Sequence, residues 1–404
     1  MKLKNKHIVL GITGSIAAYK SVSLASMLTK AGAKVDVVMT ASAAKLVAPL
    51  TFRSVTGRGA YVDDDLWQME SHVLHIDLGQ KNDAFLIAPA TANTIAKLAH
   101  GLADNLLTLT ALASRTTLLV APAMDGGMYT NPATQANLHI LAERGMIIIG
   151  PAEGHLASGL AGKGRMVEPE ELFGYLRLAL GTDGPLSGRK VVITAGGTRE
   201  PIDPVRMITN RSSGKQGYAL AQAALDLGAN VTLISAPTCL DAPIGSTLIN
   251  VTTADEMLSA VLDAVEDADA LIMAAAVADF KPTHQASEKI KKAGGVPILT
   301  LEPTPDVLGA VATHKSASGY PRLMVGFAAE SQNLLENAQS KLSSKKLDLI
   351  VANDISTPQA GFDVNTNQVT LLGVDGEKRD LPLMSKVEVA EHVLDVVVDL
   401  LGDV

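Results

Sequence analysis

The chain has 404 residues, of which 47% are hydrophobic and only 3% aromatic, and a formal net charge of -8. A net negative chain lacks the basic field with which proteins bind nucleic acid or anionic membranes, so both partners are excluded. The single cysteine, Cys239, excludes an intramolecular disulfide and a Cys-rich metal site, and it favours a reducing cytoplasm. The longest stretch without Asp, Glu, Lys or Arg, residues 126–142, is still shorter than the ~20 residues that span a bilayer.

Two segments of the chain show the same order of patterns. Each has a β-branched run, a glycine turn, an Ala-rich helical stretch, a Gly-Ala break and a second β-branched run; these segments are 7–40 and 190–234. Both predict a strand, a crossover helix and a parallel strand, so a new parallel sheet begins near residue 190. Aliphatic residues must fill both cores because aromatic residues are so few, as is typical of helices packed on buried parallel strands.

Further strands are predicted where short apolar runs end in loops. They are 84–88, 116–121, 270–274, 323–327 and 347–352, followed by a late hairpin strand at 368–372 and a closing amphipathic helix at 385–401. The turn-forming residues 181–188 indicate a linker. We therefore predict an α/β protein with two Rossmann-like or flavodoxin-like parallel-sheet domains in tandem, residues 1–180 and 189–404.

The first glycine turn, residues 11–16, lies between a predicted strand and a predicted helix, where backbone N–H groups and the helix dipole favour a phosphate. A dinucleotide would require an acidic residue after the second strand for its ribose, and Thr40 and Ser42 offer hydroxyls there instead. A mononucleotide such as FMN fits better. The alternative is that these glycines only allow a helix to pack closely on a strand.

Four spaced motifs in the first half resemble the flavoprotein family of homo-oligomeric cysteine decarboxylases. The motifs are residues 9–20, 39–43, 88–94 and 122–129. The resemblance covers residues 5 to about 178 and implies FMN held by the first three motifs between subunits of a trimer. The implied FMN contacts are Gly14, Ser15, Ile16, Thr40, Ser42, Ala88, Thr91 and Ala92.

His75 lies where the family carries its catalytic histidine. Imidazole changes charge most easily near neutral pH, which suits removal of a proton while the flavin oxidises the substrate thiol. In the family the substrate cysteine then loses CO2 and is reduced back to a thiol. Because Leu74 and Ile76 flank His75, a core histidine with no chemical role is the alternative.

The resemblance also implies substrate contacts in the first half, at Met124, Asp125, Met128 and Arg165, and a catalytic position at Ser158 in the substrate clamp. Asp125 replaces an asparagine whose amide donates to the substrate carboxylate, and an ionised aspartate would repel that group. Ser158 replaces a cysteine that supplies a proton in many members, and a serine hydroxyl is a far weaker acid. We expect an active decarboxylase in which the proton is delivered by another group.

The glycine turn of the second half is followed by hydroxyls and cations, in residues 194–206 and 209–215. A P-loop would need glycine at position 209, which is threonine, so Walker-type chemistry is excluded. Glycine amides, hydroxyls and cations at one sheet end suit a phosphorylated substrate. A solvated basic loop is the alternative.

Seven motifs of the second half closely match the bacterial phosphopantothenate-cysteine ligases. They are residues 194–206, 210–215, 274–280, 289–292, 305–306, 326–330 and 352–354. The resemblance implies that CTP activates the carboxylate of 4'-phosphopantothenate as an acyl-cytidylate, which the amine of L-cysteine attacks with release of CMP. Together the two resemblances predict a bifunctional enzyme of coenzyme A biosynthesis.

Charge builds on both reacting centres during such acyl activation, so cations and a carbonyl-polarising group are needed. The resemblance implies Lys289 as the mobile cation, Lys341 and Lys345 as phosphate ligands, Asn210 as a contact of the acyl intermediate, and Arg206 nearby. The implied nucleotide contacts are Met273, Ala274, Ala275, Asp279, Pro305, Asp306, Val307, Leu308 and Phe327. Mg2+ is expected to bridge phosphates, and no protein metal site is expected. For each lysine a solvated surface charge is the alternative.

Other functions remain open at this point. The flavoprotein half could serve only as an oligomer scaffold for the ligase, or the chain could be a non-catalytic flavin-binding interaction protein. A nicotinamide oxidoreductase is disfavoured because neither glycine turn is followed by a ribose-binding acid. The family further suggests decarboxylase trimers and ligase dimers, possibly a dodecamer, while the choice between CTP and ATP rests on resemblance alone.

Overall fold

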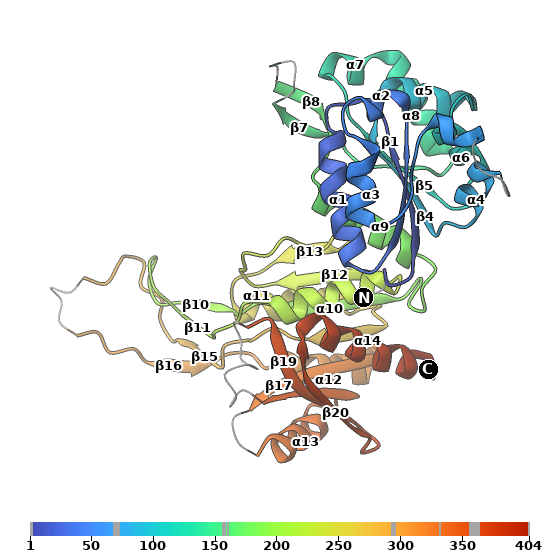
Figure 1. Ribbon diagram of the computed structural model, residues 1–404. Coiled ribbons are helices and arrows are strands. Elements are labelled where there is room, and N and C mark those ends of the chain that lie inside the picture. The colour runs from blue at the N-terminus through green and yellow to red at the C-terminus, as the bar shows by residue number, and fades with distance from the viewer. Residues whose placement is uncertain are drawn as a thin grey trace. The chain divides into compact units, whose positions relative to one another are not determined.

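The computed structural model describes residues 3–67, 73–155, 159, 161–291, 296–330, 333–354 and 364–402. The chain divides into two compact units, Met1–Leu180 and Gly181–Val404, each built on its own mainly parallel sheet (Figure 1). The predicted α/β class is confirmed.

The first unit has a six-stranded parallel sheet in the order β3-β2-β1-β4-β5-β6. The chain builds outward from β1 to β3 in one direction and from β4 to β6 in the other. The order therefore reverses between β1 and β4, and the crevice at the carboxyl ends of these two strands is where such sheets bind ligands. The strands are β1 (His7–Ile12), β2 (Lys34–Met39), β3 (Ala60–Tyr61), β4 (Ala84–Ala90), β5 (Leu118–Pro122) and β6 (Ile147–Ile148).

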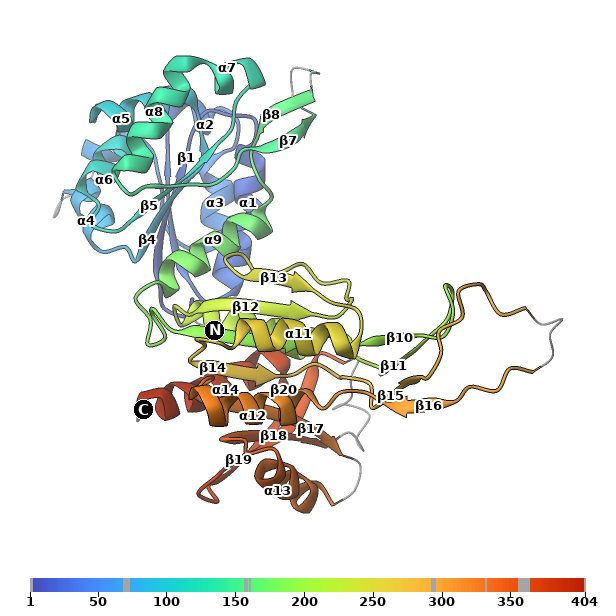
Figure 2. The ribbon, with the colours of Figure 1, turned by 180° about the vertical axis from the view of Figure 1, so that it is seen from behind.

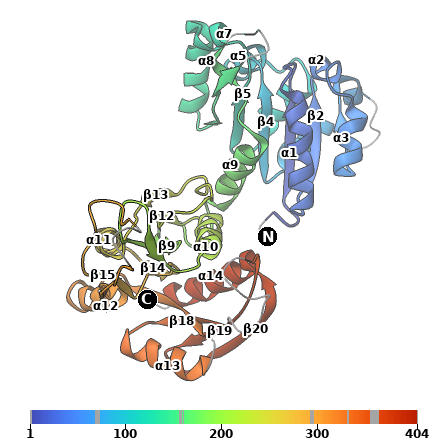
Figure 3. The ribbon, with the colours of Figure 1, turned by 90° about the vertical axis from the view of Figure 1, so that its left-hand side faces the viewer.

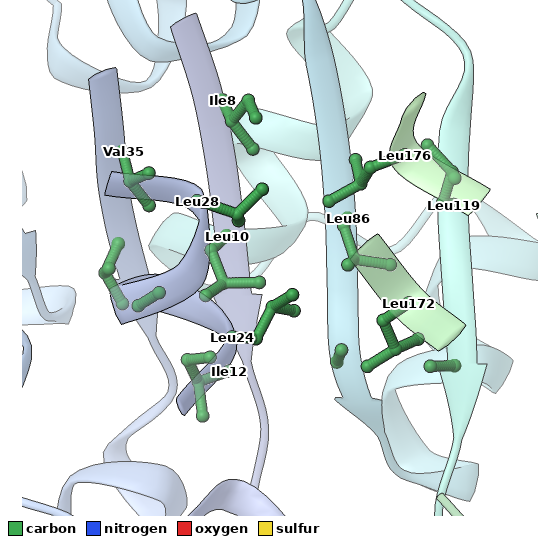
Figure 4. Close-up of a cluster of buried hydrophobic side chains, with 14 of the residues drawn as sticks. Ile8, Leu10, Ile12, Leu24, Leu28, Val35, Leu86, Leu119, Leu172 and Leu176 are labelled. Atoms are coloured by element: carbon green, nitrogen blue, oxygen red, sulfur yellow. The ribbon is translucent and has the colours of Figure 1, made fainter. Parts of the chain in front are cut away.

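Helices cover both faces of this sheet (Figures 1 and 2). On one face lie α1 (Ala18–Lys30), α3 (Pro49–Thr56) and α9 (Pro169–Gly181); on the other lie α4 (Leu74–Gln80), α5 (Ala92–His100), α6 (Leu106–Ala113) and α8 (Pro132–Glu143). Figure 4 shows Leu24 and Leu28 of α1 and Leu172 and Leu176 of α9 directed at the aliphatic side chains of the strands. Burial of each such leucine contributes about 2 kcal/mol, so the aliphatic composition suffices for a core.

A buried ion pair fixes the opposite, amino-terminal end of this sheet. Asp36 of β2 is 3% exposed and accepts hydrogen bonds from Arg58 Nε at 3.2 Å and Arg58 Nη2 at 2.7 Å, and it also pairs with His7. Burial alone would raise the pKa of Asp36, but the hydrogen bonds and charges of His7 and Arg58 outweigh burial and lower that pKa. The carboxylate is therefore ionised in the folded protein at neutral pH.

Replacing Asp36 by asparagine is expected to destabilise the first unit by about 2 kcal/mol at pH 7, less than for a fully buried pair because the guanidinium of Arg58 is partly exposed. A lowered pKa stabilises the fold above the unfolded value, near 3.8, and this stabilisation is lost as the pH falls through the folded value. Urea unfolding followed by circular dichroism should show a lower free energy of unfolding for the variant, and this difference from wild type should become smaller below about pH 4. A difference that becomes larger in acid would contradict the assignment of Asp36 as an ionised, ion-paired carboxylate.

The second unit has an eight-stranded sheet in the order β13-β12-β9-β14-β17-β18-β19-β20. It is parallel up to β18, and β19 and β20 are antiparallel additions. The order reverses between β9 and β14, which gives this sheet its own switch point. The strands are β9 (Lys190–Ala195), β12 (Asn230–Ser235), β13 (Thr247–Asn250), β14 (Ala270–Met273), β17 (Leu323–Glu330), β18 (Leu349–Asp354), β19 (Thr366–Gly373) and β20 (Lys378–Ser385).

Helices also cover both faces of the second sheet. On one face α10 (Lys215–Asp226) packs on α14 (Lys386–Gly402), as Figure 3 shows, and the core of the other face includes α11 (Ala254–Ala264), α12 (Val307–Ser318) and α13 (Leu334–Ser344). The predicted late strand and closing helix are confirmed as β19 and α14.

Two small antiparallel ribbons extend away from this sheet (Figures 1 and 2). One is formed by β10 (Arg199–Pro201) and β11 (Met207–Thr209), the other by β15 (Phe280–Pro282) and β16 (Leu301–Pro303). β10 contacts β15, so the two ribbons lie side by side. Arg206 directly precedes β11, and Lys289 lies in the connection between β15 and β16.

Candidate active sites

In the first unit, Thr13 joins the ends of the two strands at the switch point. Its hydroxyl donates to Pro89 O at 2.7 Å and accepts from Thr91 N at 3.0 Å. The turn that follows β1 therefore lies against the start of α5, and the predicted residues Gly14 and Thr91 are brought together. Ser15, Ile16 and Ala92 belong to the same two loops. Thr13 was not predicted, although it stands inside the glycine turn.

The loop after β2 closes on the same turn. A Cβ on Gly14 would lie 2.5 Å from Ser42 Cβ, a distance that only glycine permits. Thr40 begins α2 (Ala41–Ala44) by accepting from Ala43 N at 3.3 Å. Ala88 differs from the other predicted contacts because it is fully buried within β4 and its carbonyl accepts from Ser21 Oγ at 2.6 Å. Three loops thus meet at one sheet edge, while Ala88 lies beneath them in the core.

His75 lies in the first turn of α4, which packs mainly on α6. The side chain is half-buried, and its Nδ1 is buried without a hydrogen-bond partner among the residues that the structure describes. Burying a ring nitrogen without a hydrogen-bond partner costs free energy, which argues against a purely structural histidine. The element that carries His75 is not one of those forming the strand-end loops.

The predicted substrate residues near position 124 are brought together with a small hairpin. Met124 N donates to Gly164 O at 2.9 Å, and a Cβ on Gly164 would lie 2.2 Å from Met124 O, so the two backbones touch. Gly164 belongs to the hairpin of β7 (Ala152–His155) and β8 (Ala161–Arg165). Arg165, at the end of β8, is ion-paired with Glu168 at 2.6 Å. Ser158 lies outside the described residues.

Asp125 has a local structural role. It is the N-cap of α7 (Gly126–Thr130), where its Oδ1 accepts from Gly127 N at 2.9 Å. Met128, on the same short helix, is half exposed. An asparagine could cap the helix with its oxygen and still donate from its nitrogen, whereas an ionised aspartate has no hydrogen to donate.

The second unit contains a cavity of about 720 Å³ at its switch point. The loop between β11 and α10, the start of α10, the loop after β14 and the turn that begins α12 line it. Twelve of the predicted ligase residues line the cavity: Asn210, Met273, Ala274, Ala275, Asp279, Pro305, Asp306, Val307, Leu308, Phe327, Lys341 and Lys345.

Threonine side chains fix the cavity wall after β14. Thr194 Oγ1 accepts from Ala275 N at 3.1 Å, and Thr198 Oγ1 accepts from Ala278 N at 2.9 Å. Asn210, which also lines the cavity, donates from Nδ2 to Val277 O at 3.0 Å. Side chains of three residues thus hydrogen-bond the backbone of this wall.

Both predicted phosphate-binding lysines already contact oxygen atoms of the protein. Lys341 Nζ donates to Phe327 O at 3.0 Å, and Lys345 pairs with Asp306. Asp306 also caps α12 by accepting from Gly309 N at 3.0 Å. Burial would raise the pKa of Asp306, but its hydrogen bonds from Lys345 and Gly309 lower it, so its carboxylate is the counter-ion of Lys345.

The polar residues of the cavity that were missed by the sequence reasoning include Gln216, Asn353, Asn367 and Lys386. Lys386 is only 7% exposed, which is rare for a lysine and places a buried cation in the wall. The side-chain oxygens of Gln216 and Asn353 are buried and have no hydrogen-bond partner among the described residues. Asn353 stands in the quoted motif 352–354, at the end of a parallel strand, and could have been found there; the others carry no local pattern.

Two predicted residues, Arg206 and Lys289, do not line the cavity. Lys289 is exposed, and Arg206 is ion-paired with Asp203 at 2.7 Å beside the segment that carries Lys289. Within the described ranges no helix is long and apolar enough to cross a bilayer, and no cluster of three or more His, Cys, Asp or Glu side chains is arranged to hold a metal.

The two switch-point sites define an α/β protein with one candidate ligand site on each of two mainly parallel sheets. Residues 1–179 match the family model described as flavoprotein, and residues 186–401 match the DNA/pantothenate metabolism flavoprotein C-terminal domain. The coenzyme A biosynthesis bifunctional protein CoaBC of Bacillus subtilis (strain 168) is 46% identical over 401 residues, which is 98% of each chain. The chain belongs to this bifunctional coenzyme A biosynthesis family.

Two solved structures are similar in sequence to parts of this chain. The crystal structure of the C-terminal domain of a coenzyme A biosynthesis bifunctional protein CoaBC is 40% identical, with a TM-score of 0.47, over 55% of this chain and 100% of that domain. A PPC decarboxylase mutant complexed with pantothenoylaminoethenethiol is 37% identical, with a TM-score of 0.41, over 43% of this chain and 98% of that protein.

Proposed function

We propose that the protein is a bifunctional enzyme of coenzyme A biosynthesis, whose second unit ligates 4'-phosphopantothenate to L-cysteine and whose first unit decarboxylates the product. The observation that carries the ligase is the cavity at the second switch point, where twelve independently predicted residues meet. Membership of a family of full-length bifunctional proteins supports both activities. It does not favour the alternatives of a scaffold or of a non-catalytic flavin-binding module.

In the ligase, the nucleotide enters the cavity and the carboxylate of phosphopantothenate attacks its α-phosphate, forming the acyl-cytidylate and releasing pyrophosphate. When the nucleotide binds, before this step, its triphosphate oxygens replace Asp306 and the Phe327 carbonyl as partners of Lys345 and Lys341. Asn210, held against Val277 O, presents its amide to the acyl group. Cysteine's amine attacks the acyl carbon and CMP leaves. Mg2+ bound with the nucleotide would reduce the negative charge of the phosphates.

The buried wall of the cavity supplies acceptors for a substrate. Gln216 and Asn353 each have a desolvated oxygen that costs free energy until a donor reaches it. Cytosine and adenine both carry an amino group, so these oxygens support an amino-bearing base but do not choose between CTP and ATP. CTP is the proposed substrate because the motifs are of the bacterial ligase type.

Release of CMP tests the ligase. With CTP present, CMP should appear only when both cysteine and phosphopantothenate are added. CMP formed from CTP alone, or ATP turnover with no CTP turnover, would contradict the proposed reaction.

In the decarboxylase, FMN supplies the hydride acceptor that makes loss of CO2 possible. The residues of this chain fit its phosphate end, because the turn after β1 presents glycine backbone to the loops after β2 and β4 at the switch point. His75 is proposed to take the proton from the substrate thiol at its ring nitrogen. The backbone contact between Met124 and Gly164 places the hairpin of β7 and β8 over the turn that carries Asp125.

Asp125 and Ser158 alter this site without abolishing it, in our proposal. The carboxylate of Asp125 caps α7, so it is oriented even though it cannot donate when ionised. Another group or water then delivers the proton that a cysteine at position 158 would supply. The proposal fails if the flavin-loaded protein releases no CO2 from phosphopantothenoylcysteine.

Replacing Gly14 by alanine is expected to reduce the flavin content of the purified protein at least several-fold. The new methyl group would lie 2.5 Å from Ser42 Cβ, so the turn and the loop after β2 must separate. Flavin absorbance per protein chain measures the effect. The double variant Gly14→Ala, Ser42→Gly should bind more flavin than Gly14→Ala alone because the overlap is relieved; equal flavin in all variants would contradict the site.

The assembly and location of the protein are also proposals. A homo-oligomer, possibly a dodecamer of decarboxylase trimers and ligase dimers, is supported by the family resemblance. A cytoplasmic location is supported by the single cysteine and the nature of the substrates.

A further inference from the structure

Asp203 is a buried carboxylate in a peripheral part of the fold. It lies in the turn between β10 and β11, its side chain is 0% exposed, and nearby Val205 and Met207 are exposed. Burying a carboxylate is costly unless its oxygens are fully hydrogen-bonded. The position of Asp203 in an otherwise exposed turn therefore needs an explanation beyond the turn itself.

The two oxygens of Asp203 serve different segments. Oδ1 accepts from Val205 N at 2.7 Å and Arg206 N at 2.8 Å, which closes the turn. Oδ2 accepts from Arg206 Nη1 at 2.7 Å and from Ile290 N at 3.1 Å. Ile290 is distant in the sequence and directly follows Lys289. One carboxylate thus bonds the turn of Arg206 to the segment of Lys289.

Two more hydrogen bonds complete this connection. Arg206 Nη1 also donates to Ile290 O at 3.1 Å, and Ala286 N donates to Ile202 O at 2.9 Å. The segment 286–290 is therefore held at both ends by the turn 202–206. Arg206 and Lys289 therefore lie on two segments that hydrogen bonds join.

The carboxylate must be ionised for this role. Burial would raise the pKa of Asp203, but the amides of Val205, Ile290 and Arg206 and the charge of Arg206 outweigh it and hold that pKa below its ordinary value. An asparagine could not replace it, because both oxygens of Asp203 accept hydrogen bonds and the NH2 group of asparagine cannot accept one.

We propose that Asp203 is a positioning residue of the ligase, which unites Arg206 and Lys289 into one cationic unit for the phosphate and carboxylate oxyanions of the substrates. The inference rests on the ligase function proposed above and deepens it. Asp203 touches no reacting atom; it acts through Lys289. Neither Arg206 nor Lys289 lines the cavity of the chain as described. The joined segments that carry them therefore determine whether both cations reach the substrates.

The test compares Asp203→Asn with wild type in the full-length, flavin-loaded protein by two readouts. Hydrogen exchange at the amide of Ile290 should become at least about 10-fold faster, because its acceptor is lost. Ligase kcat should fall by about 100-fold, the cost of misplacing a reacting group. The double variant with Lys289→Gln should be no slower than Lys289→Gln alone, because both changes remove the same contribution.

Asp255→Asn is the matched control. It breaks the 2.7 Å pair between Asp255 and Lys281 of β15, beside the same ribbons, and should leave both readouts unchanged. If Asp203→Asn does not fold, Ile290→Pro removes the donor from the other side and should reduce kcat similarly. Wild-type exchange at Ile290, faster exchange with unchanged kcat, or additive losses with Lys289→Gln would each overturn the proposal. Absence of CMP release by wild type would instead refute the ligase function. The exchange rate would still show whether Asp203 holds the amide of Ile290.

Discussion

Replacing Lys289 by glutamine is expected to lower ligase turnover by about 100-fold or more, because one donor to a charge that develops in the transition state is removed. Lys289 is exposed and does not line the cavity, so it should act after the nucleotide has entered. The loss is therefore expected in kcat, with little change in the affinity for CTP measured by calorimetry. Decarboxylation of supplied phosphopantothenoylcysteine should be unaffected, because that site belongs to the first unit.

Lys281→Gln is the control for this experiment. Lys281 stands on β15, close in sequence to Lys289, and its ammonium is paired with Asp255. Replacing Lys281 should leave ligase turnover close to that of the wild type. A Lys289→Gln protein with full ligase turnover would remove Lys289 from the mechanism and would return it to the class of solvated surface charges.

Replacing His75 by glutamine is expected to lower decarboxylase turnover by 100-fold or more, within the range of about 10²–10⁴ for the loss of a general base. Ligase turnover should remain, so the product ligated from phosphopantothenate should accumulate with its carboxylate intact. Mass spectrometry of the thiol product distinguishes this result from a general loss of folding. The buried Nδ1 of His75, which has no hydrogen-bond partner in the described part of the chain, is the structural reason to expect a chemical role.

His100→Gln is the matched control for His75. His100 is exposed at the end of α5, in the same unit, and its replacement should leave CO2 release unchanged. Equal effects of the two histidine substitutions, or undiminished CO2 release from His75→Gln with flavin bound, would show that His75 is a core histidine after all.

The sheet cores and both sites follow from patterns that the sequence contains. The strands β4, β5 and β14 are continuous apolar runs followed by loops, and a parallel sheet places the ends of such strands at one edge. That Asn210, Asp279 and Lys345 share one site was expected only from the resemblance to the ligase family, because Asn210 follows the ribbon strand β11 and Lys345 ends α13. The glycine at position 14 marked a close approach, which the overlap with Ser42 explains.

Other features could not be predicted because tertiary contacts alone produce them. The edge strand β20 buries little besides Leu381, so it has no apolar alternation to detect. Lys386 becomes part of the cavity only because α14 packs beside α10. The hydrogen bond from Ile290 N to Asp203 joins the segments of Arg206 and Lys289, which are far apart along the chain, and local sequence gives no indication of it.

The most direct test of two successive reactions in one chain is an assay of the flavin-loaded protein with phosphopantothenate, cysteine and CTP, in which CMP, CO2 and the mass of the final thiol are measured. We expect equimolar CMP and CO2 and a thiol that has lost its carboxylate. Omission of CTP should abolish both products from phosphopantothenate but not the decarboxylation of supplied phosphopantothenoylcysteine. CMP without CO2, with the carboxylated thiol accumulating, or no CMP under any condition, would contradict the account.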